Sequence, residues 1–207
     1  VGEDYGQGDT WTWTNTVTYN KTFAEEHHLS VLLGTEAIGY TFKSLSASRQ
    51  GYAFEDADYM QIDAGTGTRN NGGNKSQWGV FSLFGKIDYN YHDRYLASFT
   101  IRRDENSRFA KGNRAGVFPA FSLAWRPSQE SFWPENEVLT DLKIRYSWGQ
   151  NGNANIPALY PAYSTYIFNT GNGAYDITGT NSSTTSGITL AATGNPDLRW
   201  ETTTQNN

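Results

Sequence analysis

Residues 85–109 read GKIDYNYHDRYLASFTIRRDENSRF, a stretch in which bulky apolar side chains alternate with charged and polar ones. The apolar members all fall on odd-numbered positions: Ile87, Tyr89, Tyr91, Tyr95, Ala97, Phe99 and Ile101. Successive side chains of a β-strand point to opposite faces of the sheet, so we expect all seven on one face. The alternation is too strict for a helix and too charged for a strand buried on both faces. The stretch therefore predicts two strands with one apolar face, which meets either a protein core or lipid.

The composition limits the class of protein without deciding between these two environments. The 207 residues carry a net charge of −5, which argues against a nucleic-acid partner, because such a partner requires a basic surface. The chain has no cysteine, so it can form neither a disulfide framework nor a cysteine-ligated zinc site. No apolar run approaches the roughly 18 residues of a membrane-spanning helix. A mean hydropathy of −0.65 is typical of soluble proteins, but transmembrane barrels also look polar on average.

The same alternation recurs along the chain and predicts seven strands. Their expected ranges are 10–20, 29–42, 77–91, 95–103, 117–126, 142–149 and a last one that starts near 198. Most reach the ~9–11 residues that a tilted strand needs to cross a bilayer, whereas ordinary strands have about five or six. The links 21–28 and 92–94 are short, while 44–76 and 150–197 are long. This pattern is typical of outer-membrane barrels, although the link 127–141, which suggests a short helical turn, is longer than the pattern favours.

The order of side chains along the apolar face favours lipid. A three-residue turn after Tyr91 would pair that residue with Tyr95. The same register pairs Ile87 with Phe99, and the next strand brings Trp125 beside Tyr95. Tyrosine and tryptophan then gather beside the turn, at the headgroup level, and hydrocarbon side chains lie deeper. The side chains expected to face lipid are Phe81, Leu83, Ile87, Tyr89, Tyr91, Tyr95, Phe99, Ile101, Phe121, Leu123 and Trp125.

The opposite face of these strands is too charged for an ordinary protein core. We expect it to line a wet lumen with Lys86, Asp88, Arg102, Arg126, Lys143 and Arg145. Pro119 removes a backbone donor, so we expect it near the loop end of its strand, where a bulge is tolerated. The predicted fold class is all-β: an antiparallel meander of long strands that forms a partial transmembrane β-barrel with long extracellular loops.

Longer motifs resemble a known family. Residues 102–132, RRDENSRFAKGNRAGVFPAFSLAWRPSQESF, resemble a stretch of the SusC/RagA-like TonB-dependent outer-membrane transporters of Bacteroidetes-type bacteria. Further pieces resemble the same family in the same order: FSLFGKIDYNYHDRYLASFTIRRD (81–104), LTDLKIRYSWGQNGNANI (139–156) and NPDLRWETTTQ (195–205). The earlier HHLSVLLGTEAIGY (27–40) is compatible with it.

The resemblance implies a plug domain inside a barrel of about 22 strands. It also implies a non-enzymatic importer of glycans or peptides in the bacterial outer membrane, with a SusD-like surface lipoprotein as lid, energy from the TonB complex and no cofactor. No segment resembles the plug or the TonB-contacting part. We therefore expect residues 1–207 to be a single incomplete barrel segment that reaches TonB through parts missing from it.

Several other motifs have ordinary explanations. His27 and His28 point to opposite faces and, with His92, lack the spacing of a metal site, so we expect turn and interface roles. The acidic run 55–63 lacks the glycine and final glutamate of a calcium loop; solvated loop acids are the expectation, and an ion site is the alternative. The spacing of the residues identifies no Ser/His/Asp arrangement, and there is no cysteine nucleophile. Nothing in the sequence therefore indicates an enzyme.

The long link contains an aromatic stretch, NIPALYPAYSTYIFNTGNGAYD, at residues 155–176. Aromatic rings stack on the apolar faces of sugars while amides bind hydroxyl groups, and peptides would suit the same mixture. The candidate substrate-binding residues are Tyr160, Tyr163, Tyr166, Phe168 and Tyr175. The alternative is that these rings pack the loop against its neighbours or against the lid.

One alternative function stays open at this point: a secreted, soluble β-sandwich module that binds carbohydrate through its loops. The two hypotheses differ over the odd-numbered face of residues 77–126. A sandwich covers that face with a second sheet of the same chain, whereas a barrel wall leaves it bare.

Overall fold

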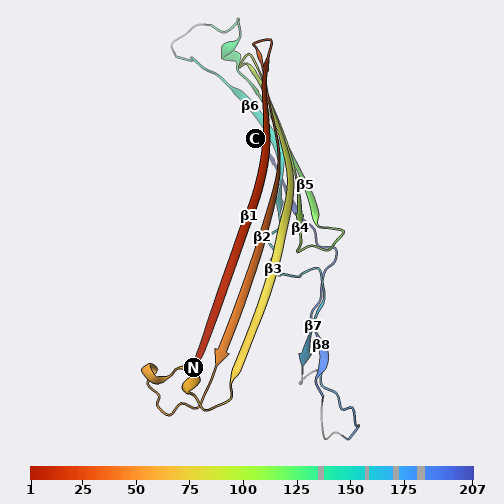
Figure 1. Ribbon diagram of the computed structural model, residues 1–207. Coiled ribbons are helices and arrows are strands. Elements are labelled where there is room, and N and C mark those ends of the chain that lie inside the picture. The colour runs from red at the N-terminus through yellow and green to blue at the C-terminus, as the bar shows by residue number, and fades with distance from the viewer. Residues whose placement is uncertain (135–137, 157–158, 170–172, 181–184) are drawn as a thin grey trace. The chain divides into compact units, whose positions relative to one another are not determined.

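The computed structural model describes residues 1–134, 138–156, 159–169, 173–180 and 185–207 (Figure 1). Within these ranges the strands are β1 (Gly2–Phe23), β2 (His27–Ser48), β3 (Asn70–Tyr91), β4 (Tyr95–Asn106), β5 (Ala115–Trp125), β6 (Ile144–Asn153), β7 (Thr165–Asn169), β8 (Gly187–Ala192) and β9 (Glu201–Asn206). The short 3-10 helices are η1 (Ala57–Tyr59), η2 (Ile62–Ala64) and η3 (Pro127–Gln129). Among the described residues, no helix is both long and apolar enough to cross a membrane.

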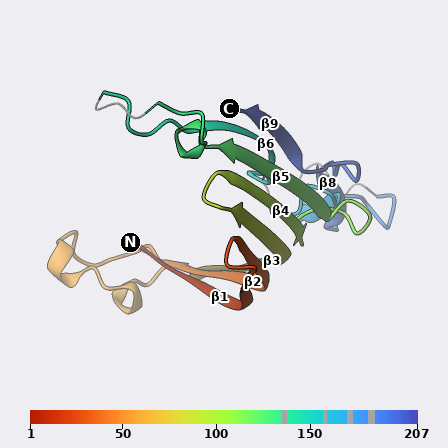
Figure 2. The same ribbon diagram turned by 90° about the horizontal axis from the view of Figure 1, so that it is seen from above.

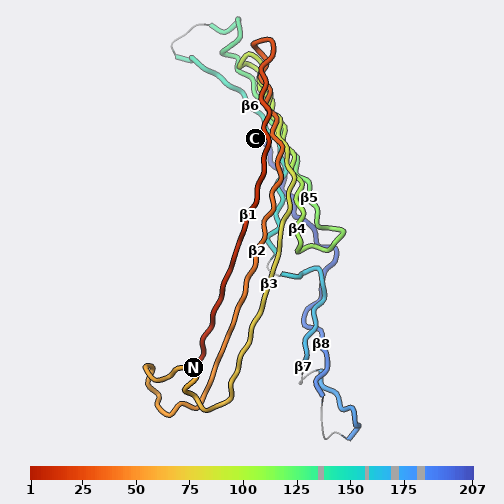
Figure 3. Tube along the Cα trace, in the orientation of Figure 1, coloured from red at the N-terminus to blue at the C-terminus, as the bar shows by residue number. Residues whose placement is uncertain are grey.

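Seven strands form one sheet in the order β1-β2-β3-β4-β5-β6-β9, while β7 and β8 form a separate two-stranded sheet. The strands from β3 to β6 and then β9 follow one another in this order in Figure 2, and Figure 3 traces β7 alongside β8. All seven strands expected from the sequence are present, and the all-β antiparallel meander is confirmed.

The chain divides into two compact units. One comprises Val1–Trp13 and Ile38–Gly79, and the other comprises Thr14–Ala37 and Val80–Asn207. The first unit contains the link between β2 and β3, where Arg49 donates hydrogen bonds to the carbonyl oxygens of Asp63 and Gly67 (3.0 and 3.2 Å). The second unit contains every candidate lipid-facing, lumen-facing and substrate-binding residue.

Two links are shorter than the sequence predicts. The polar stretch 44–76 is expected to be a loop, whereas β2 continues to Ser48 and β3 starts at Asn70. A ladder needs only backbone donors and acceptors, so a strand can continue where its side chains no longer alternate between apolar and polar. The loop expected at 150–197 is also shorter than predicted, because β6 continues to Asn153 and the β7/β8 hairpin lies inside this range.

The turns that follow β1 and β3 are tight and contain no glycine. Their residues at positive φ are Ala24 (50°), Glu25 (59°), His92 (54°) and Asp93 (55°). Two successive residues at positive φ define a type I′ turn, whose twist matches that of the flanking strands. In the second turn the Asn90 side-chain oxygen accepts a hydrogen bond from the Asp93 amide (3.0 Å). Both short links expected from the sequence are therefore tight turns.

The register of the central strands is the predicted one. β3 and β4 pair Tyr91 with Tyr95 and Ile87 with Phe99. β4 and β5 pair Tyr95 with Trp125. The odd-numbered side chains of these strands therefore share one face, with amphipathic rings beside the turn and hydrocarbon side chains further along.

Pro119 lies within β5 without a bulge, which corrects the expectation from the sequence. β4 and β5 pair without a break in register along the whole of β5. The ladder between β5 and β6 begins at Ala120 and Gly149, one residue beyond the proline. The missing N–H group therefore falls at the end of a ladder, where a proline is tolerated.

Burial is sparse and avoids the odd-numbered face. Within the described ranges the buried apolar residues are Phe109, Phe118, Pro127 and Ala162, and the buried polar ones are Ser76, Ser82, Asp104 and Asn106. The large odd-numbered side chains of β3, β4 and β5 are exposed except Tyr89 and Tyr91, which are half-buried, and no second sheet of the described chain covers this face. This observation contradicts the β-sandwich alternative, which requires such a cover.

Candidate functional site

The odd-numbered face of the second unit is a broad apolar surface. Nine of the eleven side chains expected to face lipid are exposed, with exposed fractions between 37% for Trp125 and 54% for Leu123. Tyr89 and Tyr91 are half-buried because they pack against neighbouring rings. Contiguous apolar patches of this kind mark surfaces that meet a partner or a membrane.

Aromatic rings from neighbouring strands stack beside the tight turns. Phe23 stacks on His27 (ring centroids 5.2 Å apart), His27 on Tyr91 (4.6 Å), and Tyr91 on Tyr95 (6.3 Å). The Tyr89 hydroxyl lies 2.6 Å from His27 Nδ1. We call Phe23, His27, Tyr91 and Tyr95 the turn-end ring cluster. His27 therefore lies beside a tight turn and packs on neighbouring rings, while its interface role stays a prediction.

The three histidines serve different contacts. His28 Nδ1 lies 3.0 Å from Thr22 Oγ1, so His28 and His27 point to opposite faces. His92 Nε2 lies 2.7 Å from a carboxylate oxygen of Glu26 in the neighbouring turn. Among the residues that the structure describes, no group of three or more His, Cys, Asp or Glu side chains could hold a metal ion.

Glu130, just after η3, anchors the polar ends of the rings near the turns. Its carboxylate accepts hydrogen bonds from the Tyr95 hydroxyl (2.6 Å) and from Trp125 Nε1 (3.1 Å), and Arg94 lies 3.5 Å away. The hydrogen bond from Tyr95, then that from Trp125, lowers the pKa of Glu130, and Arg94 adds to the effect. Sequence reasoning did not single out Glu130, because its link shows no periodicity.

Acid should loosen this anchor. Because the pKa of Glu130 is lower in the folded protein than in the unfolded chain, the ionised carboxylate stabilises the folded state. This contribution is present above the unfolded pKa of about 4.3 and is lost as the pH falls through the folded pKa. We expect tryptophan fluorescence to report a transition below roughly pH 4 that is absent from Glu130→Gln. Identical acid titrations of the two proteins would contradict this prediction.

The even-numbered face carries a charged network across three strands. Arg102 donates hydrogen bonds to Glu36 (2.7 Å), Asp104 (2.7 Å) and Ser82 (2.9 Å). Its guanidinium also lies over the Phe84 ring, 5.4 Å from the centroid. Charge-assisted bonds and a stacked ring fix the Arg102 side chain, so it ties β2, β3 and β4 together.

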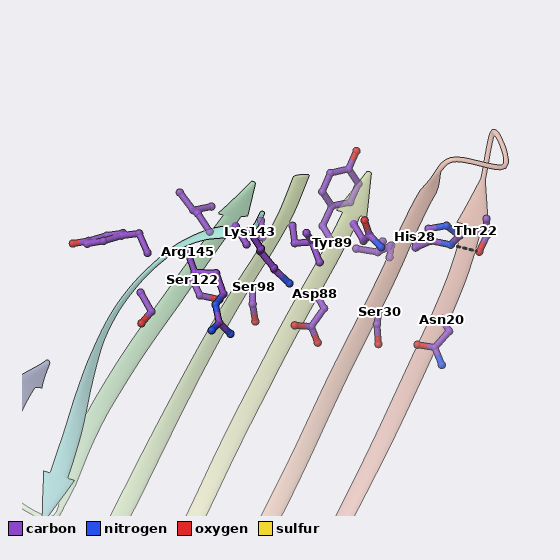
Figure 4. Close-up of a pocket in the computed structure, with 18 of the residues that line it drawn as sticks. Asn20, Thr22, His28, Ser30, Asp88, Tyr89, Ser98, Ser122, Lys143 and Arg145 are labelled. Atoms are coloured by element: carbon purple, nitrogen blue, oxygen red, sulfur yellow. Dashed lines mark hydrogen bonds between the residues drawn. The ribbon is translucent and has the colours of Figure 1, made fainter. Parts of the chain in front are cut away.

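Near the turn end, the same face bears a cavity of about 880 Å³. Figure 4 shows Asp88, Ser98, Ser122, Lys143 and Arg145 beside it, on neighbouring strands and the lead into β6. These side chains offer hydroxyl groups and charges of both signs. They can hold water or a polar partner, but they do not form a nucleophile with an adjacent base.

The remaining candidate lumen-facing residues have separate partners. Lys86 forms an ion pair with Asp88 (2.9 Å) on the same strand. Arg126 lies just beyond β5 and pairs with Asp141 (3.2 Å). The six candidates therefore do not form one site.

The β7/β8 hairpin presents part of the predicted aromatic set. Tyr166 pairs with Leu190 and Phe168 with Ile188, so these four exposed side chains share one face of the hairpin. Leu190 and Ile188 were not among the residues predicted from the sequence. Their contribution depends on a pairing that a Gly/Asn/Thr-rich stretch does not reveal.

The other three rings lie outside this hairpin. Tyr160 and Tyr163 belong to the turn before β7, where the Tyr163 amide donates to the Tyr160 carbonyl (3.1 Å). Tyr175 pairs with Thr185 in an isolated bridge beyond the hairpin. All three are exposed. The structure therefore unites Tyr166 and Phe168 and places the remaining candidates separately.

The loop between β4 and β5 holds both ends of the segment that carries the hairpin. Arg108 donates hydrogen bonds to the carbonyl oxygens of Ala154 (2.7 Å) and Ile156 (3.1 Å), which follow β6. Asn113 donates to the carbonyl oxygen of Pro196 (2.8 Å), which precedes β9. The loop therefore fixes the base of the hairpin segment from both sides.

A small aromatic core packs beneath the loop between β4 and β5 and adds to these hydrogen bonds. Trp200 Nε1 donates to the carbonyl oxygen of Arg114 (2.8 Å), and its ring packs on Phe109 and Phe118 (centroids 5.5 and 5.4 Å apart). We call Arg108, Phe109, Asn113 and Trp200 the base clasp. The motifs at 102–132 and 195–205 thus meet in space, although the sequence did not reveal this contact.

Comparisons with known proteins agree with this geometry. The chain matches the family model described as TonB dependent receptor-like, beta-barrel over residues 2–207. It is 29% identical to TonB-dependent receptor P3 of Formosa agariphila over 92% of this chain and 18% of that protein. It is 38% identical to TonB-dependent receptor SusC of Bacteroides thetaiotaomicron over 60% of this chain and 12% of that protein.

A solved structure gives a similar result. The structure titled as the RagAB peptide transporter matches with a TM-score of 0.85 and 26% identity, over 99% of this chain and 22% of that one. The chain thus spans less than a quarter of the length of these relatives. The named relatives are receptors and transporters, not enzymes. Together, the uncovered apolar face, the antiparallel meander and a family match along the chain establish that it belongs to the TonB-dependent receptor-like β-barrel family, in its SusC/RagA-like branch.

Proposed function

We propose that these 207 residues form part of the barrel wall of a TonB-dependent nutrient importer in the bacterial outer membrane. The observation that carries the proposal is the bare odd-numbered face, on which rings gather at the turns and hydrocarbon side chains lie further along. This order suits a bilayer, whose headgroup region takes up amphipathic rings. The plug and the TonB-contacting region would belong to other parts of the complete receptor.

The lengths of the links support an orientation of the wall across the membrane. Short turns of outer-membrane barrels face the periplasm and long loops face the exterior. The turn-end ring cluster would then lie at the periplasmic boundary, and the β7/β8 hairpin would lie outside the cell. A ligand and a SusD-like surface lipoprotein would both arrive from that side.

The cargo proposed is an oligosaccharide or a peptide. One similar structure is titled as a peptide transporter, which supports the peptide class, and the resemblance to the SusC/RagA-like family implies glycans as the other class. Exposed rings and apolar side chains on the hairpin offer stacking surfaces, while the surrounding amide and hydroxyl groups offer hydrogen bonds. Either cargo fits this mixture.

Importer activity is tested by uptake. Cells that carry the complete receptor should accumulate labelled oligosaccharides or peptides only when a functional TonB complex is present. Uptake that continues unchanged without TonB, or none from either class of ligand, would contradict the proposal.

The hairpin assignment is tested by replacing Tyr166 and Phe168 together with alanine. Each ring contributes about 1 kcal/mol, so ligand affinity should fall roughly tenfold or more while the amount of receptor in the membrane stays the same. Ile167→Ala, on the other face of the same strand, is the matched control. Unchanged ligand affinity in purified receptor without its lid would show that the rings only pack, and would leave importer activity standing.

A further inference from the structure

Two lysines face each other in the first unit, where β2 and β3 approach the link between them. Gln77 Nε2 donates a hydrogen bond to Thr41 Oγ1 (3.1 Å), which joins the two antiparallel strands at this point. Lys43 lies two positions after Thr41, and Lys75 lies two positions before Gln77. Antiparallel pairing therefore places the two lysines opposite each other on one face of the sheet.

This pair of like charges has no counter-ion of its own. Both lysines are exposed, and among the described residues neither forms an ion pair. Asp9 lies on β1, but its carboxylate accepts a hydrogen bond from Gln7 Nε2 instead (3.4 Å). Like charges directly opposite each other destabilise a sheet. An external anion between the two ammonium groups would remove this repulsion and gain charge-assisted hydrogen bonds.

The lysines line a shallow groove of about 490 Å³ that suits a phosphorylated sugar. Tyr5, Gln7 and Leu45 line the same groove, and the Tyr5 and Leu45 side chains are well exposed. An aromatic ring offers a stacking surface to a sugar, and an amide offers hydrogen bonds to its hydroxyl groups. The two ammonium groups supply the charge that a phosphate requires.

Two tryptophans place this groove close to a membrane boundary. Trp11 and Trp13 are exposed, and the Trp11 indole lies over Gly39, where a Cβ atom would clash with it. Exposed tryptophans are typical of the headgroup level of a barrel. Lys43 follows Gly39 by four positions, or roughly 13 Å along the strand. A strand tilt of about 40° reduces this to roughly 10 Å across the membrane.

The side of the membrane selects the class of lipid. The long links lie at the exterior in the proposed orientation, so the groove meets the exterior leaflet. That leaflet of a bacterial outer membrane consists largely of lipopolysaccharide, whose innermost sugars carry both phosphate groups and acyl chains. A phosphate attached to a sugar directly above the hydrocarbon therefore lies at the level of the two lysines.

We propose that Lys43 and Lys75 bind a phosphate group of one lipopolysaccharide molecule. Tyr5 packs against the sugar that carries this phosphate, and Gln7 binds one of its hydroxyl groups. This inference rests on the proposed function, because it requires the chain to form a wall in the outer membrane. It goes further in assigning a glycolipid headgroup to one place on that wall.

The test uses the complete receptor purified in mild detergent and native mass spectrometry. Lipid A with both phosphate groups, and the same lipid A after removal of both, are added in turn and the retained lipid is counted. We expect the phosphorylated form to be retained preferentially. Lys43→Gln and Lys75→Gln should each reduce its retention about tenfold, the effect of one charge-assisted hydrogen bond.

The control variant is Lys111→Gln. Lys111 is an exposed lysine in the loop between β4 and β5, so its replacement makes the same change in net charge away from the groove. Thermal unfolding gives a second readout. Without lipid, Lys43→Gln should unfold at a higher temperature than the wild type, because the repulsion is removed. Phosphorylated lipid A should stabilise the wild type and Lys111→Gln more than Lys43→Gln.

Glucosamine phosphate tests whether the ligand is a membrane lipid or a dissolved anion. It carries the sugar and the phosphate but no acyl chain. We expect it to displace phosphorylated lipid A only at a large excess. Displacement at equal concentration would overturn the assignment to a membrane glycolipid.

The remaining outcomes distinguish this inference from the proposed function. Equal retention of the two forms of lipid A would overturn the inference, as would Lys43→Gln and Lys75→Gln variants that match Lys111→Gln. If the receptor still folds into lipid vesicles in those cases, the proposed membrane wall stands. Failure of the wild-type receptor to enter vesicles would overturn both.

Discussion

Phe109→Ala is expected to destabilise the loop end of the sheet by about 3–5 kcal/mol, the usual range for truncating a buried phenylalanine. Phe109 is 0% exposed and packs on Trp200, so alanine would leave a cavity inside the base clasp. Limited proteolysis of the complete receptor in detergent should report the change as rapid cleavage near 107–114. Thermal unfolding should show a matching loss of stability.

Phe54→Ala is the control, because Phe54 is an exposed phenylalanine in another loop and should cost less than about 0.5 kcal/mol. Trp200→Phe separates packing from hydrogen bonding, since it keeps a ring but removes the bond to the Arg114 carbonyl oxygen. That variant should cost about 1 kcal/mol. Equal cleavage of Phe109→Ala and Phe54→Ala would show that the base clasp does not hold the loop.

Phe99→Arg and Leu123→Arg are each expected to cost about 2–4 kcal/mol for folding into lipid vesicles, as charges near the middle of a bilayer do. Both side chains are exposed on the odd-numbered face and lie between the turn and the loop end of their strands. Lys86→Ala, on the opposite face, should cost far less. Equal penalties at all three positions would mean that the face assignment is wrong.

Arg102 is unsuitable as the neutral control for this experiment, although its side chain lies on the charged face. It holds Glu36, Asp104 and Ser82 together. Arg102→Ala would leave the buried Asp104 carboxylate without its cation, which adds a penalty unrelated to lipid. Lys86 forms an ion pair with Asp88, and both side chains are well exposed. Lys86→Ala therefore measures the cost of a substitution on the charged face without leaving a buried charge unpaired.

The sequence alone was enough to predict the central register. Strict alternation around a tight turn leaves one arrangement that keeps Tyr91, Tyr95 and Phe99 on the same side, because a slip by one residue would move every ring to the charged face. The ends of β2 and β3 could not be predicted in this way. Their polar residues continue the ladder through backbone groups, which leave no periodic signal.

The candidate site was predictable only in part. The exposed rings of the hairpin segment stood out by composition, but their pairing with Leu190 and Ile188 depends on a turn in a stretch without alternation. Glu130 and Trp200 were missed for a similar reason. Each acts through partners that are distant in the sequence, such as the carbonyl oxygen of Arg114, 86 positions before Trp200.

That distance has a consequence for the order in which the chain is assembled. The hairpins that contain Ala24 and His92 close over a few residues and can form as soon as their strands are available. The loop at 107–114 must wait for Trp200, because contacts of high sequence separation form late. As the sheet assembles, the loop end of β4 and β5 would therefore remain open to proteases until β9 joins it, after the turns at the other end are complete.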